Sequence, residues 1–255
     1  MRPDELLTFS VLDWVMLALA ATLIGVSKTA LPGVATVPVA LFAAVLPAKE
    51  STGALLVLLL VGDVTAVCAY RAFTDWAALR RLIPSVVGGV VGGTGLLVVA
   101  GDEVIRRVIG GMLVLLVVVN VVLLVRAVPA ADDEHAPARL VSVTYGFLGG
   151  FTTMVANAGG PVMSMYFLAS RFSVSAFLGT AAWFFFVVNA IKLPFSLGLG
   201  LITRESLVMN LWLVPAVLVG AWMGRTWARR ISQSWFNMAV MVLTLASGAY
   251  LLVLP

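Results

Sequence analysis

The chain has 255 residues, of which 62% are hydrophobic and only 11% are charged, and its mean hydropathy is +1.09. A soluble domain carries about 25% charged residues, so a water-soluble fold is excluded and the lipid bilayer surrounds most of the chain. The net charge of +4 comes from Lys and Arg at the ends of apolar segments, which is typical of loop anchors and excludes a nucleic-acid partner. With one cysteine, Cys68, and one histidine, His135, neither a disulfide framework nor a metal centre is expected.

Apolar segments follow one another along the chain, at 11–27, 29–47, 51–71, 81–100 and 104–127, then at 139–157, 160–170, 175–199, 205–226 and 234–254. A helix needs about 20 apolar residues to cross a bilayer, and the last three segments of each half reach that length. The first two of each half do not, because segment 160–170 is too short and prolines break segment 29–47. We therefore predict an all-α polytopic membrane protein. Since Asp4 and Glu5 cancel the charge of Arg2, we expect the first segment to be a retained span and no cleaved signal peptide.

A polar stretch at 129–139 divides the chain into a first membrane repeat, 1–128, and a second, 140–255. We interpret the stretch as a solvated linker without chemistry. The halves resemble each other, since Gly53 and Asp63 align with Gly179 and Asn189 at one constant offset. At a second constant offset, the first-half residues Pro84, Gly89 and Gly93 align with Pro215, Gly220 and Gly224. The chain is therefore predicted to be an internal duplication.

The arginines predict how the halves are oriented. The loop after 51–71 contains Arg71, Arg80 and Arg81, and the loop after 205–226 contains Arg225, Arg229 and Arg230. Both loops are expected in the cytoplasm. Because one follows the third segment of its half and the other follows the fourth, each half must cross the membrane an odd number of times. The prediction is two inverted repeats, each of three full spans and a pair of short or broken helices, with both chain termini outside.

Two breaks in the apolar pattern occur at equivalent positions, Gly25–Gly33 and Gly149–Pro161. Each offers hydroxyl groups, an opened backbone and a helix N-terminus, which together suit an anion. The alternative is that Gly and Pro there only allow kinks and close helix packing. The breaks supply these candidate substrate-binding residues: Ser27, Lys28, Thr29, Gly33, Thr152, Thr153, Asn157, Gly159 and Gly160.

Ionisable residues also occur within the apolar segments. Asp63 stands near the centre of 51–71, where a charge costs at least ~2.5 kcal/mol to insert, so a functional role is the default interpretation. In the second half, Asn189 and Lys192 lie one helical turn apart and complete the candidate substrate-binding set. Two interpretations stay open at this point. Lys192 attracts an anion while Asp63 takes up a coupling proton, or the two form a buried ion pair that joins the halves.

The motifs Gly-Val-Ser-Lys-Thr-Ala-Leu-Pro-Gly at 25–33, Gly-Phe-Leu-Gly-Gly-Phe-Thr-Thr-Met-Val-Ala-Asn-Ala-Gly-Gly-Pro at 146–161 and Asn-Ala-Ile-Lys-Leu-Pro at 189–194 resemble the sulfite exporter TauE/SafE family. This family is also called the toluene-sulfonate uptake permeases. The resemblance covers nearly the whole chain. It implies a multi-pass permease of a bacterial-type inner membrane that moves sulfite, an organosulfonate or a related sulfur-containing anion.

The sequence thus predicts a secondary transporter for a small anion, with possible proton coupling through Asp63 and with no cofactor. It contains no Walker-type phosphate loop, so ATP is not the expected energy source. The alternatives are a non-transporting accessory subunit and an intramembrane enzyme. An enzyme would need paired catalytic groups within spans, whereas the histidine lies in the linker and Asp63 is the aspartate expected near mid-membrane.

Overall fold

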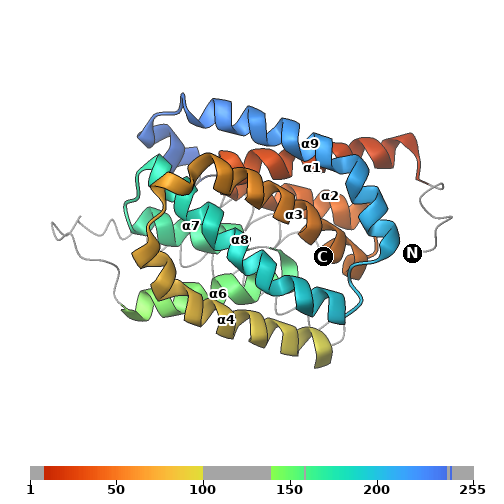
Figure 1. Ribbon diagram of the computed structural model, residues 1–255, viewed down its shortest axis with the longest axis horizontal. Coiled ribbons are helices and arrows are strands. Elements are labelled where there is room, and N and C mark those ends of the chain that lie inside the picture. The colour runs from red at the N-terminus through yellow and green to blue at the C-terminus, as the bar shows by residue number, and fades with distance from the viewer. Residues whose placement is uncertain (1–8, 100–138, 158, 240–241, 243–255) are drawn as a thin grey trace.

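The computed structural model describes residues 9–99, 139–157, 159–239 and 242, and in this part of the chain all regular structure is helical (Figure 1). The predicted all-α class is therefore confirmed. The elements are, in chain order, α1 (Val11–Thr29), η2 (Pro32–Ala35), α2 (Thr36–Val45), α3 (Ala48–Tyr70), η3 (Arg71–Phe73), α4 (Trp76–Val99), α6 (Arg139–Ala156), α7 (Gly159–Ala169), α8 (Val174–Gly198) and α9 (Arg204–Ala228).

Within the described ranges, 5 helices are long and apolar enough to cross a membrane: Val11–Thr29, Glu50–Phe73, Trp76–Val99, Val174–Gly198 and Arg204–Ala228. Their number agrees with the predicted polytopic membrane protein. The predicted segment 104–127, most of 234–254 and nearly all of the linker 129–139 lie outside the described residues.

The structure corrects the predicted length of the first segment. We expected 11–27 to fall short of a span, but α1 continues to Thr29 and has 19 residues. The other short elements are as expected, since α2 has 10 residues and α7 has 11, and a helix of that length cannot cross a bilayer. Asn157 ends α6 with a φ of 52°, a left-handed conformation that stops a helix. Both breaks in the apolar pattern are thus breaks in the helices.

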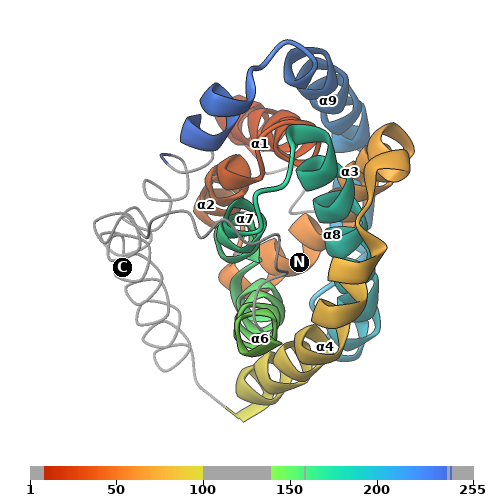
Figure 2. The same ribbon diagram turned by 90° about the vertical axis from the view of Figure 1, so that its left-hand side faces the viewer.

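Matching helix contacts occur in the two halves. Helix α1 lies along α9, and α4 lies along α6 (Figure 2). A Cβ atom on Gly25 would stand 2.1 Å from the carbonyl oxygen of Val217, and one on Gly150 would stand 2.2 Å from that of Val86. The reciprocal approaches are those of Gly220 to the Thr22 oxygen, at 2.0 Å, and of Gly89 to the Phe147 oxygen, at 2.1 Å. The equivalence agrees with an internal duplication, and the opposite membrane orientation of the halves stays a prediction.

The two basic connections lie at the same end of the helix bundle, around the start of α8 (Figure 1). From the connection between α3 and α4, the Thr74 hydroxyl donates to the Gly179 carbonyl at 3.2 Å. From the segment that follows α9, Gln233 Oε1 accepts from the Val174 N–H at 2.8 Å. Helix α6 also begins at this end, with Arg139. The arrangement is the one expected if this end faces the cytoplasm.

We accordingly expect the linker 129–139 to be cytoplasmic and Pro255 to be external. Single cysteines placed at the two sites, in a Cys68→Ser background, would be tested in intact cells with a membrane-impermeant thiol reagent. The reagent should label the cysteine at the C-terminus, whereas the cysteine in the linker should react only after the cells are opened. Labelling of the linker in intact cells would contradict the assigned orientation.

Candidate anion-binding site

A buried ion pair joins α1 to α3. The Lys28 ammonium, in the last turn of α1, lies 2.6 Å from Asp63 Oδ1, and the Asp63 side chain is fully buried. The Asn189 amide on α8 donates to Asp63 Oδ2 at 2.6 Å. The structure thereby corrects one of the two sequence interpretations, because Asp63 pairs with Lys28 and not with Lys192. Lys28 is nearer to Asp63 than Lys192 is, because α1 ends at the first break beside the middle of α3.

Lys192 instead holds the second break together. Its ammonium donates to the Thr153 carbonyl oxygen at 2.6 Å and to Asn157 Oδ1. Both acceptors stand at the C-terminal end of α6, where unpaired carbonyls and the helix dipole attract a cation. The Asn157 Nδ2 group donates to the Thr52 carbonyl on α3 at 3.3 Å, which ties the end of α6 to a third helix.

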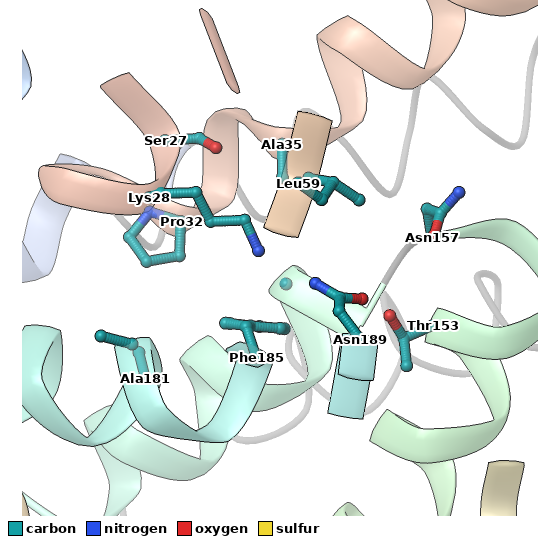
Figure 3. A pocket seen from close by; sticks show the side chains of 12 residues that line it. Ser27, Lys28, Pro32, Ala35, Leu59, Thr153, Asn157, Ala181, Phe185 and Asn189 are labelled. Carbon is teal, nitrogen blue, oxygen red and sulfur yellow. The ribbon is translucent and has the colours of Figure 1, made fainter. Parts of the chain in front are cut away.

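The two breaks enclose a cavity that is partly open to its surroundings (Figure 3). Polar groups and apolar side chains from both halves line it: Ser27, Lys28, Pro32, Ala35, Leu59, Thr153, Asn157, Gly160, Ala181, Ala182, Phe185 and Asn189. The breaks meet directly, because a Cβ atom on Gly160 would stand 2.9 Å from the Pro32 carbonyl oxygen. The arrangement brings a cation, two hydroxyl groups, two amides and the first turn of α7 to one space.

The model of the sulfite exporter TauE/SafE family matches residues 17–251 of the chain. The chain belongs to this family. It is therefore a multi-pass membrane transporter of the permease type, as the motifs at the two breaks predicted. Comparisons with curated proteins and with solved structures gave no significant match.

Some of the predicted binding residues line the cavity of this TauE/SafE family member, namely Ser27, Lys28, Thr153, Asn157, Gly160 and Asn189. Sequence reasoning missed the apolar lining. Phe185 belongs to it, and the Lys28 ammonium lies 4.5 Å from its ring centre, a cation–π distance. A spacing of four residues links Ala181, Phe185 and Asn189 on one face of α8, and this periodicity could have identified the aromatic ring from the sequence.

The other predicted residues support the cavity from outside its lining. The Thr29 hydroxyl donates to the carbonyls of Gly25 and Ala221, and the Thr152 hydroxyl donates to that of Leu148. These hydroxyls therefore satisfy backbone carbonyls and do not face the cavity. The remaining predicted residues are Gly33 in η2, Gly159 at the start of α7, and Lys192 and Asp63, which bond to the lining residues.

Proposed function

We propose that the protein is a secondary transporter that moves a small anion across a bacterial-type cytoplasmic membrane. The proposed cargo is sulfite, an organosulfonate or a related sulfur-containing anion, and it binds in the cavity between the two breaks. The observation that carries the proposal is the buried charge. Lys28 pairs with the Asp63 carboxylate, whereas the buried Lys192 has only uncharged acceptors, so two lysines stand against one carboxylate among the described residues of the site.

The cavity supplies the groups that an oxyanion needs. Lys28 attracts the charge. The Thr153 hydroxyl donates to no residue that the structure describes, whereas the hydroxyl of its neighbour Thr152 donates to the Leu148 carbonyl. The first turn of α7, whose N–H groups have no acceptor within the helix, borders the same space at Gly160. Phe185 and Leu59 provide apolar surface for the organic part of a sulfonate.

A non-transporting accessory subunit is the second candidate function. Such a subunit has no need for buried cations and amides around a shared cavity, because each costs free energy to place in a membrane. Our proposal assigns the protein transport and no catalytic activity, and it requires no cofactor and no metal ion.

The experiment that tests the proposal is uptake of radiolabelled sulfite and of a radiolabelled sulfonate by liposomes that contain the purified protein. We expect saturable uptake when a pH gradient is imposed and no ATP is present. Liposomes without protein are the control. Proteoliposomes that take up neither anion under any imposed gradient would contradict the proposed function.

Neighbouring threonines on α6 provide a matched pair of variants for the same assay. Thr153→Val should raise the apparent KM for the anion severalfold, because the loss of one hydrogen bond costs about 0.5–1.5 kcal/mol and more when the acceptor is charged. Thr152→Val should leave the KM near that of the unmodified protein, since the Thr152 hydroxyl donates to Leu148 within its own helix. Equal effects of the two variants would contradict the assigned cavity wall.

A further inference from the structure

The orientation of the Asn189 amide is fixed by its partner. An ionised carboxylate only accepts hydrogen bonds, so the amide nitrogen of Asn189 must face Asp63, as it does at 2.6 Å. The amide oxygen is consequently turned the other way, and in Figure 3 it points toward Thr153 and Asn157. Asn189 is 1% exposed, and its Oδ1 atom accepts no hydrogen bond from any residue that the structure describes.

With Asp63 ionised, the cavity is therefore expected to bind an anion weakly. The Asn189 amide oxygen presents lone pairs to the cavity, and these repel the oxygens of a sulfonate or sulfite. The Lys28 ammonium, which should attract the anion, is held by Asp63 at 2.6 Å. An unpaired buried acceptor also destabilises the protein, so a change that gives it a hydrogen bond is favoured.

We propose that protonation of Asp63 rotates the Asn189 amide and so converts the cavity from an anion-repelling to an anion-binding state. The proton comes from water and forms an O–H group on Asp63, which donates to Asn189 Oδ1. The Asn189 Nδ2 group then faces the cavity and donates to the anion. At the same time Lys28 loses its negative partner and becomes available to the anion. Asn189 is thus an anion-binding residue, and the protonation state of Asp63 decides whether its amide oxygen or its amide nitrogen faces the cavity. The inference rests on the proposed function and adds its coupling step.

The charged groups around Asp63 make it the candidate proton acceptor. Lys28 contacts it from α1, and Lys192 acts on it from α8 without a hydrogen bond. The other charged side chains described on the helices that pack against α3 lie at helix ends: Asp13 on α1, Arg71 in η3, and Arg204, Glu205 and Arg225 on α9. Among the described residues around Asp63, there is therefore no second carboxylate that could take up the proton in its place.

Methanesulfonate is a suitable probe, because it stays ionised at ordinary pH and has acceptor oxygens but no donor. Its binding to the purified protein in detergent would be measured by titration calorimetry in buffers of different ionisation enthalpy. We expect one proton to be taken up for each anion bound at every pH at which Asp63 of the free protein is ionised. Affinity should be highest at low pH and should fall about tenfold per pH unit once free Asp63 is ionised. Binding without proton uptake at all pH values would contradict the inference, whereas no binding of methanesulfonate or sulfite at any pH would contradict the proposed function itself.

Variants distinguish the role of Asp63 in proton uptake from the role of Asn189 in anion binding. Asp63→Asn should bind methanesulfonate without proton uptake and with little dependence on pH. Asn189→Leu should keep the proton uptake but bind severalfold more weakly at low pH. Asn210→Ala is the control, because this buried amide donates to Ala54 away from the cavity and its loss should change neither quantity. Proton uptake by Asp63→Asn, or unweakened binding by Asn189→Leu, would overturn the proposal.

One measurement needs no variant. Infrared difference spectra of the unmodified protein, recorded on addition of methanesulfonate at neutral pH, should show the carbonyl band of a newly protonated carboxyl group. A spectrum with bound anion and no such band would overturn the proposal even if the variants failed to fold.

Discussion

Replacing Lys28 with alanine is expected to destabilise the protein by about 3–5 kcal/mol, because it leaves the fully buried Asp63 carboxylate without its cation. The same change should abolish anion transport, since the cation at the cavity wall is lost. Stability would be measured as the thermal unfolding temperature of the purified protein in detergent. Transport would be measured by uptake of labelled sulfite into proteoliposomes.

The double variant Lys28→Ala/Asp63→Asn separates these two effects. It removes both charges of the pair and leaves an amide beside Asn189, so most of the lost stability should return. Transport should stay absent, because no cation faces the cavity from α1. A double variant that transports as well as the unmodified protein would show that Lys28 serves only the fold.

Replacing Gly25 with alanine is expected to prevent accumulation of folded protein. The added Cβ atom would stand 2.1 Å from the Val217 carbonyl oxygen and 2.4 Å from the Ala221 backbone nitrogen, so α1 and α9 would have to separate. The equivalent change Gly150→Ala should have the same effect on α4 and α6, because the new atom would stand 2.2 Å from the Val86 oxygen. The readout is the amount of monodisperse protein recovered in detergent.

Gly95→Ala in α4 is the matched control. A Cβ atom there meets nothing within 4 Å among the described residues, and alanine favours a helix over glycine by about 1 kcal/mol. This variant should therefore be recovered in normal amounts. Recovery of Gly25→Ala in equal amounts would mean that α1 and α9 do not approach as closely as described.

Local chemistry was enough to predict the class of the fold and the positions of its breaks. Long apolar runs with few charges can be stable only as helices in a bilayer, because every backbone polar group there must be bonded internally. Pro32 and the glycines at 159 and 160 interrupt those runs, and the structure ends or begins helices beside them. The sequence also marked Lys28, Asn189 and Lys192 as candidate substrate-binding residues and Asp63 as the candidate proton acceptor.

The end of α1 shows where local reasoning failed. Hydropathy falls at Lys28, so the sequence predicted that the segment ends at residue 27. The helix continues to Thr29 because two tertiary contacts compensate its polar last turn. Asp63 neutralises the lysine, and the Tyr70 hydroxyl donates to the Thr29 carbonyl at 2.8 Å. Neither partner is close in sequence.

The sequence by itself thus determined a helical membrane protein with polar residues at two helix breaks, because composition, apolar run length and Gly/Pro placement are local properties. Only the tertiary structure decided which groups of the site meet. Either lysine could have paired with Asp63, and the packing of α1 against α3 selected Lys28. Adjacent residues point about 100° apart around a helix, so the rotation of α6 decided that Thr153 lines the cavity while Thr152 bonds to its own backbone.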